Sequence, residues 1–282
     1  MILKERIELY YPQDINKIDR HEALQTFNEL KFFLNNGEIR AASPSAGEGN
    51  AAGWIIHDWV RKGILLGFRL GELTDVSIDE HFKYFDKSTY PLKKMTLDHD
   101  VCMAPGGSSI RDGSYIAPGV LIQPPAYINV GAYVDKNAMI DSHVQIGSCA
   151  QIGKRVHVGA AAQIGGLLEP ISERPVIIED DVFIGGNTGI YEGTVIKQRA
   201  IIAAGVILTG ATSVYDVVRE KIYHRTKETP LIIPENAVVV PGSRPLDSPF
   251  AKKNQLALVA PIIIKYHERT SDASTILEES LR

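Results

Sequence analysis

The sequence is poor in cysteine, with two residues among 282, Cys102 and Cys149, which lie in different segments. They show no CxxC spacing, so the sequence predicts neither a disulfide framework nor a zinc site. Such cysteine usage fits a reducing compartment, and we expect a cytoplasmic protein.

The chain also lacks an excess of basic residues and long apolar runs. Its formal net charge is −4, its pI is about 6.1, and Lys and Arg form no block, so we expect no nucleic-acid partner. No stretch approaches the roughly eighteen apolar residues that span a bilayer, and the first residues lack the apolar core of a signal peptide. A composition of 44% hydrophobic and 23% charged residues is typical of globular proteins, so we expect a soluble chain with no membrane partner.

What the sequence does have is an internal repeat in its second half. One aliphatic position recurs every six residues, which fits neither the helical period of 3.6 nor the strand period of 2. These anchors are Ile110, Ile116, Ile122, Ile128, Val134, Ile140, Ile146, Ile152, Val158 and Ile164, and then Ile178, Ile184, Ile190, Ile196, Ile202, Leu208 and Val214.

A second signal keeps the same phase, because a small or β-branched residue follows each anchor by four positions, from Ser114 to Ala162 and from Val182 to Thr212. The pattern predicts short strands joined by tight corners and stacked coil on coil around an aliphatic column. Residues that tolerate sharp turns supply the corners. These are Gly131, Gly147, Gly153, Gly159, Gly185, Asp135, Asp141 and Asn187.

The hexad pattern resembles the bacterial hexapeptide-repeat transferases, which are left-handed β-helices and usually trimers. More specifically, GAYVD at 131–135, IGSCAQIGK at 146–154 and GGLLEP at 165–170 resemble the tetrahydrodipicolinate N-succinyltransferase family, as do flanking pieces from about residue 20 onward. The fold class that follows is mainly β: a left-handed parallel β-helix at 101–243, an N-terminal α/β domain at 1–100 and a C-terminal strand and helix at 244–282.

The resemblance implies an acyl-CoA-dependent N-acyltransferase. It would move a succinyl group from succinyl-CoA to the amine of tetrahydrodipicolinate, a small dicarboxylate, in diaminopimelate and lysine biosynthesis. It implies a homotrimer with sites between subunits, coenzyme A as co-substrate, no permanently bound cofactor and no metal. Two alternatives stay open: an acyltransferase of this fold with another donor, such as acetyl-CoA, or another acceptor, and a non-catalytic β-helix scaffold.

Outside the coils, the sequence predicts helices at 21–37, closed by Gly37, and at 54–66, a flexible connection at 43–53, and an interdomain turn at 97–100. A strand at 256–269 and a short helix at 273–282 follow the last coil. The hexad phase is interrupted at 166–175 and at 215–233, and the second excursion resembles one that closes over the acyl donor in the family. Cys149 is predicted to pack in the interior.

Transfer to an amine requires a group that accepts its proton. The resemblance places Asp141 against the substrate amine, although an ordinary aspartate, with a pKa near 3.9, is a weak base at neutral pH. The family often has a second carboxylate where this chain has Gly189 and a tryptophan where it has His143. Glu192 matches another family glutamate, and His143 is either a general base or a surface histidine.

A dicarboxylate needs cationic partners, and Arg111 is the nearest candidate for substrate binding. An arginine that the family uses a few residues earlier is absent. Lys154, Arg155, Lys197 and Arg199 either meet carboxylate or phosphate groups or form a solvated basic face. The resemblance suggests a coenzyme A groove lined by small corner residues and Lys197. The small residues are Gly165, Gly166, Gly185, Gly186, Ala203, Ala204 and Gly205.

Overall fold

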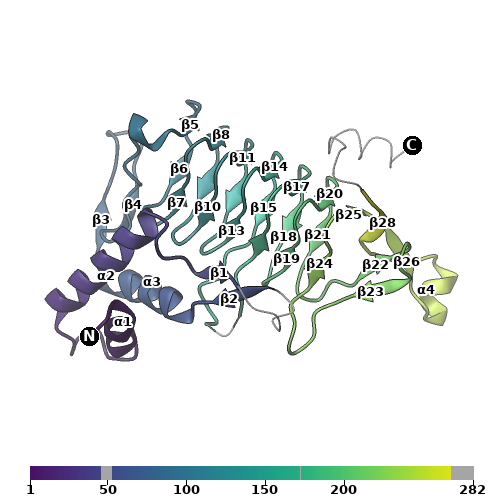
Figure 1. Ribbon diagram of the computed structural model, residues 1–282, viewed down its shortest axis with the longest axis horizontal. Helices are drawn as coiled ribbons and strands as arrows, with labels where there is room; N and C mark the ends of the chain where they lie inside the picture. Colours follow the sequence, from purple (N-terminus) through teal and green to yellow (C-terminus); the bar gives the residue numbers. More distant parts are fainter. Residues whose placement is uncertain (46–52, 172, 268–282) are drawn as a thin grey trace.

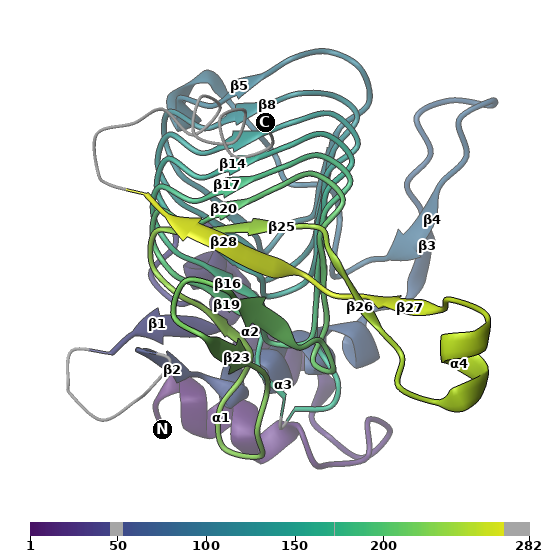
Figure 2. The ribbon, with the colours of Figure 1, turned by 90° about the vertical axis from the view of Figure 1, so that its right-hand side faces the viewer.

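The structure is a computed structural model that describes residues 1–45, 53–171 and 173–267 (Figure 1). Its main body is a prism of short parallel strands, most of them two residues long, wound in coils and stacked into three sheets. We name the sheets A, B and C in the order in which the chain visits them. Figure 2 shows the coils end-on.

Sheet A contains ten strands, and sheets B and C contain six each. Sheet A consists of β5 (Cys102–Met103), β8 (Leu121–Ile122), β11 (Met139–Ile140), β14 (His157–Val158), β17 (Phe183–Ile184), β20 (Ile201–Ile202), β25 (Ala237–Val240), β28 (Ile262–Tyr266), β22 (Val214–Asp216) and β23 (Lys221–Tyr223). Sheet B consists of β6 (Ser109–Ile110), β9 (Tyr127–Ile128), β12 (Gln145–Ile146), β15 (Gln163–Ile164), β18 (Gly189–Ile190) and β21 (Ile207–Leu208). Sheet C consists of β7 (Tyr115–Ile116), β10 (Tyr133–Val134), β13 (Gln151–Ile152), β16 (Ile177–Ile178), β19 (Val195–Ile196) and β24 (Ile232–Ile233).

The aliphatic anchors form the core of the prism. Every anchor from Ile110 to Val214 is buried in one continuous cluster, and the small residues beside them fill the corners. The register is regular: Ile140 pairs with Ile122 in the preceding coil and with Val158 in the following one. Each coil therefore buries its apolar face only because its neighbours cover it.

The corners use two devices, and only one of them was predicted correctly. A residue with positive φ recurs every six residues, including Asn137, His143 and Cys149. Gly147 does not serve in this way, because its φ is not positive. It is needed because an added Cβ would lie 2.0 Å from the backbone nitrogen of Gly166 in the next coil. The same close approach explains Gly153, Gly159 and Gly185, so their predicted role as flexible turn residues is corrected.

Three helices form the N-terminal unit: α1 (Leu3–Tyr10), α2 (Arg20–Asn35) and α3 (Asp58–Leu70). Their apolar faces share a core that reaches Val130 and Cys149 at the corner between sheets B and C. Helix α2 ends just before Gly37, as predicted, and Gly37 has a φ of +74°. The helix predicted from residue 54 begins only at Asp58, because residues 54–56 instead pair with β1.

The remaining elements are short hairpins and turns. β1 (Ala42–Pro44) pairs with β2 (Trp54–Ile56), so the predicted connection at 43–53 is in part a hairpin, whose residues 46–52 lie outside the described ranges. β3 (Leu73–Asp75) pairs with β4 (Phe85–Lys87) and projects away from the coils (Figure 2). The 3₁₀ turn η1 (Leu97–His99) precedes the first coil.

After the last coil, the predicted single strand is divided at Ala260–Pro261. Its parts are β27 (Ala257–Val259), which pairs with β26 (Ser243–Pro245), and β28. The helix α4 (Pro249–Lys253) lies between β26 and β27. The predicted helix at 273–282 lies outside the described residues. The predicted fold class, a left-handed parallel β-helix with an N-terminal α/β unit, is confirmed.

Candidate active site

Asp141 lies at the corner between sheets A and B, directly after β11, and its carboxylate is paired. The Oδ2 atom lies 2.9 Å from Nε2 of His157, the first residue of β14 in the next coil. The edge of the imidazole meets the ring of Phe183 from the coil after that, with centroids 5.0 Å apart and planes at 82°. The side chains of Asp141 and His157 are 24% and 35% exposed, respectively, so a substrate can reach both.

Sequence reasoning missed His157, although the sequence contained a signal for it. Met139 pairs with His157 in the register, so one coil spans eighteen residues. Two residues beyond Met139, Asp141 must then lie beside His157 on the same outer face. Counting by coils instead of searching for motifs finds this pair.

The A/B corner carries a strip of small residues in the coils beyond Asp141. The strip comprises Gly159, Ala160, Gly185, Gly186, Ala203, Ala204 and Gly205, so five of the predicted coenzyme-binding residues lie together. An added Cβ on Gly185 would lie 2.3 Å from the backbone nitrogen of Ala204, and one on Gly159 would lie 2.7 Å from the Ile184 oxygen. The backbones of successive coils are therefore in direct contact here.

This strip presents unused backbone donors. The N–H groups of Gly159, Gly185 and Gly205 donate to backbone carbonyls of adjacent coils. Those of Ala160, Gly186 and Ala204 donate to no acceptor in the described part of the chain. Ala160 and Ala204 are exposed and Gly186 is half-buried, so three donors form a column that a ligand with carbonyl groups can meet.

His143 belongs to the same corner as Asp141 but has a backbone role there. It occupies the positive-φ position, with a φ of +62°, and its N–H donates to the Pro125 oxygen at 2.6 Å. The residue is exposed, and no side-chain hydrogen bond or ion pair joins it to another described residue. Its role as a base stays a prediction.

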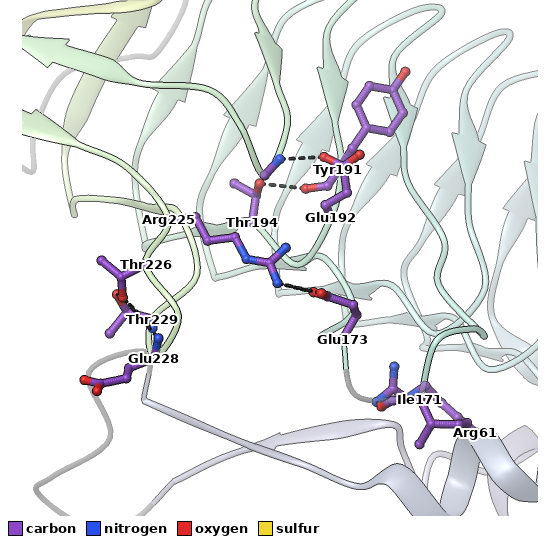
Figure 3. A network of polar contacts seen from close by, with 11 residues as sticks. Arg61, Ile171, Glu173, Tyr191, Glu192, Thr194, Arg225, Thr226, Glu228 and Thr229 are labelled. Carbon is purple, nitrogen blue, oxygen red and sulfur yellow. Dashed lines mark hydrogen bonds and ion pairs between the residues drawn. The ribbon is translucent and has the colours of Figure 1, made fainter.

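Glu192 lies at the opposite edge of sheet B, at the corner between sheets B and C. Its Oε2 accepts a hydrogen bond of 2.5 Å from the Gly210 N–H, and it lines a polar cavity of about 200 Å³ together with Glu173 and Arg225 (Figure 3). Within one chain, the structure therefore does not bring Glu192 to Asp141. Its assignment as a catalytic residue stays a prediction.

Arg111 is likewise at the B/C corner, and its guanidinium already has partners. It forms an ion pair with Asp86 of β4 and lies 5.5 Å from the ring centroid of Phe68 and 5.8 Å from that of Tyr90. Its side chain is 17% exposed. A dicarboxylate would have to compete with Asp86, and Arg111 does not face the Asp141 corner of its own chain.

The other predicted cations lie at the third corner, between sheets C and A, and most are paired within the chain. Lys197 bonds to Glu179 at 2.8 Å, Arg155 forms a bidentate pair with Asp181, and Arg199 forms an ion pair with Glu235. These pairings account for the charges without a bound phosphate. The predicted coenzyme contact of Lys197 finds no support from its position.

Gly165 and Gly166 also differ in place from the other predicted coenzyme-binding residues. They lie at the B/C corner, where an added Cβ on Gly166 would lie 2.2 Å from the Ser148 nitrogen. Beyond them, the fully buried Arg61 of α3 donates to the Ile171 carbonyl and fixes the first phase interruption (Figure 3). The two glycines therefore permit close packing between adjacent coils in the single chain.

Three further findings concern metal ligands, membrane-spanning helices and Cys149. Residues 1–45, 53–171 and 173–267 contain no group of three or more His, Cys, Asp or Glu side chains that could hold a metal ion. Nor does any helix in these ranges have the length and apolar character needed to cross a membrane. Cys149 is buried, as predicted, and burial raises its thiol pKa to about 12, so it is not poised as a nucleophile.

Comparison with known proteins defines the class. Residues 2–70 match the model of the tetrahydrodipicolinate N-succinyltransferase N-terminal domain, and residues 175–210 match that of the hexapeptide repeat of succinyl-transferase. A solved structure of a putative 2,3,4,5-tetrahydropyridine-2-carboxylate N-succinyltransferase from Campylobacter jejuni has the same fold, with a TM-score of 0.55 at 17% identity. The match covers 85% of this chain and 62% of that one. The protein is thus a hexapeptide-repeat β-helix of the acyltransferase class.

Two curated relatives narrow this class. The 2,3,4,5-tetrahydropyridine-2,6-dicarboxylate N-succinyltransferase of Psychrobacter cryohalolentis is 38% identical over 275 residues, covering 96% of this chain and 91% of the relative. The enzyme with the same name from Wigglesworthia glossinidia brevipalpis is 46% identical over 236 residues, covering 82% and 79%. The chain belongs to the tetrahydrodipicolinate N-succinyltransferase family.

Proposed function

We propose that this protein transfers a succinyl group from succinyl-CoA to the amine of tetrahydrodipicolinate, with the reaction at the A/B corner beside Asp141. The observation that carries the proposal is the juxtaposition of the Asp141 carboxylate with the small-residue strip of the same corner. The carboxylate can bind an amine, and the strip offers an extended surface, free of large side chains, on which a long acyl donor can lie. Family membership over nearly the whole chain supports the choice of substrates.

The strip suits the pantetheine arm of coenzyme A. Its amide carbonyls need donors at intervals along an extended chain, and adjacent coils are about 4.8 Å apart. The free N–H groups of Ala160, Gly186 and Ala204 supply such donors, and the absence of large side chains permits close approach. The thioester would then lie at the Asp141 end, where an amine can attack its carbonyl carbon.

The acceptor's carboxylates require cations, and in the described part of one chain the predicted cations do not lie at this corner. Arg111, Lys197 and the other predicted cations lie at the other two corners. We therefore propose a homotrimer, in which a neighbouring prism brings its B/C corner against the A/B corner of the first. Arg111 and Glu192 would then meet the acceptor from the second subunit, and the predicted roles of both residues depend on this arrangement.

The test measures thiol release by the purified protein with tetrahydrodipicolinate and either succinyl-CoA or acetyl-CoA. Asp141→Asn keeps the size of the side chain but removes the charge, and we expect a loss of at least about 100-fold in kcat. Asp135→Asn is the matched control, because Asp135 takes the same place in its hexad at the C/A corner. No turnover with either donor, or equal loss in both variants, would refute the proposal.

Donor choice separates this function from the closest alternative, an acyltransferase of the same fold with another donor. That alternative is motivated by Gly189, where the family often has a carboxylate. A kcat/KM for succinyl-CoA at least tenfold above that for acetyl-CoA supports the proposal, and the reverse ratio favours the alternative. Sedimentation at the assay concentration checks the trimer, and an active monomer would contradict the two-subunit site.

A further inference from the structure

We propose that Asp141 and His157 form a proton relay in which His157 takes up the proton that Asp141 removes from the acceptor amine. The inference rests on the proposed N-acyl transfer and adds to it a residue that the sequence pattern did not single out. His157 acts through Asp141 and is therefore a positioning residue that also holds the proton.

The geometry leaves one atom of each partner for this task. Asp141 Oδ2 and His157 Nε2 are 2.9 Å apart, a hydrogen-bond distance. Among the described residues, neither Asp141 Oδ1 nor His157 Nδ1 has a hydrogen bond or ion pair to a side chain or backbone group. Oδ1 is therefore available to the amine, and Nδ1 is available to solvent.

Two apolar residues flank the imidazole along sheet A. Met139 of β11 flanks it in the register on one side, and Phe183 of β17 meets it on the other. Asp141 is the one titratable group among the described residues that contacts the ring from these strands.

A relay to His157 compensates for the weak basicity of a carboxylate that acts alone. A carboxylate in water accepts a proton from an ammonium only at a high energetic cost, because its ordinary pKa is near 4. An imidazole titrates near 6.5 and holds a proton at neutral pH far better. The chain has no carboxylate at position 189, and Glu192 is bonded to the Gly210 N–H at another corner. His143 shares the corner, but among the described residues His157 is the base whose side chain contacts Asp141.

The reaction balances without a further reagent. The amine nitrogen attacks the thioester carbonyl carbon, the C–N bond forms, and the C–S bond breaks with its electron pair on sulfur. The amine proton passes to the Asp141 carboxylate and from it to His157 Nε2, which can accept it because the neutral imidazole of the relay carries its own proton on Nδ1. The imidazolium then returns its proton, through Asp141 or solvent, to the coenzyme A thiolate, so the products are the amide and the free thiol.

The first test compares His157→Gln with wild type in the succinyl-CoA assay from pH 5.5 to 8.5. The glutamine amide can still donate a hydrogen bond to Asp141 but cannot hold a proton at these pH values. We expect kcat to fall by about 100-fold or more, with KM for both substrates within about threefold. A rise of wild-type kcat with pH across this range should be absent in the variant, because the relay requires a neutral imidazole.

His81→Gln is the matched control, since the His81 side chain is 80% exposed on the β3–β4 hairpin and lies 3.5 Å from the adjacent Glu80 carboxylate. It should retain wild-type kcat and pH profile. His157→Ala is the second variant, in case glutamine disturbs the corner. Added imidazole should raise the kcat of His157→Ala at least about tenfold, whereas added formamide should not.

The outcomes separate the relay from the overall function. If wild type turns over but His157→Gln keeps its kcat and its pH profile, the relay is wrong and the proposed function stands. If His157→Gln loses activity through KM alone and imidazole does not rescue His157→Ala, the residue is merely structural and the relay is again wrong. If wild type is inactive with both donors, the proposed function itself fails.

Discussion

The phenol ring of Tyr191 lies over Gly189 on the outer face of sheet B. A Cβ added to Gly189 would lie 2.6 Å from Tyr191 Cε2 and 2.9 Å from the Cδ1 atom of Ile207. Tyr191 thus occupies the space that a side chain at position 189 would need, and the resemblance implies that the family often has a carboxylate at this position. The ring can lie there because residue 189 is a glycine, since a larger side chain would collide with it.

This relationship predicts a non-additive pair of substitutions. Gly189→Glu alone must displace the ring. We expect this substitution to lower the free energy of unfolding by about 1–3 kcal/mol and to lower the melting temperature accordingly. Adding Tyr191→Val, which removes the obstacle, should recover most of that loss, with a coupling of about 1–2 kcal/mol in a double-mutant cycle. Additive effects in urea unfolding would show that the ring does not fill the site.

The regular burial of the anchors predicts opposite effects for two adjacent residues of β12. Ile146 is fully buried in the prism core, whereas Gln145 faces solvent. Ile146→Ala should cost about 2–5 kcal/mol, because it leaves a cavity between stacked coils. Gln145→Ala should change stability by less than about 0.5 kcal/mol. Equal losses in thermal or urea unfolding would mean that the coil register is wrong.

Much of the fold could be predicted because the hexad signal is local and repeated. Each anchor from Ile110 to Val214 needs only its neighbours in adjacent coils, so a periodic pattern in sequence becomes a periodic structure. The N-terminal unit was harder to predict. Residues Trp54 to Ile56 are apolar enough for a helix, but the pairing partner in β1 decided their conformation.

Candidate site residues could be predicted from the sequence only through the resemblance to the family. Asp141 and the small residues of one corner lie together, but Glu192, Arg111 and Lys197 lie at other corners. Which corner a residue occupies depends on its place within the eighteen-residue coil, and two interruptions of the phase shift that count. Hydrogen bonding such as that between His157 and Asp141 follows from the coil count and not from sequence neighbours.

Arg225 joins the two interruptions of the hexad phase, because it lies at 215–233 and forms an ion pair with Glu173 at 166–175. Its Nη2 atom lies 2.6 Å from both carboxylate oxygens of Glu173, and both side chains are about one-third exposed. Arg225→Glu should repel Glu173 and Glu192 and free residues 224–231, so we expect faster cleavage there by thermolysin. Exchanging both charges, Glu173→Arg with Arg225→Glu, should restore much of the protection, since exposed pairs contribute up to about 1 kcal/mol.

Lys227→Glu is the control for this charge reversal. It introduces the same charge change in the same segment, and Lys227 forms no ion pair within the described ranges. Its cleavage rate should stay near that of wild type. If Lys227→Glu and Arg225→Glu are cleaved equally fast, net charge and not the Glu173 pair controls the segment.

Cys149 predicts how stability changes above neutral pH. Burial raises its pKa to about 12 in the folded protein, although Arg61 acts in the opposite direction, whereas an unfolded cysteine titrates near about 8.5. The raised value means that the neutral thiol favours folding at pH values below about 8.5. This contribution is lost as the pH rises toward 12, because the unfolded chain releases a proton that the folded chain keeps.

The measurement is the free energy of unfolding in urea between pH 7.5 and 10.5, at one protein concentration. Wild type should lose up to about 1.4 kcal/mol more per pH unit than Cys149→Ala in the upper part of this range. Cys102→Ala, which removes an exposed thiol, should follow the wild-type slope. Parallel slopes for wild type and Cys149→Ala would mean that the thiol is already ionised or accessible in the folded state, and that the B/C corner beneath the N-terminal helices is open to solvent.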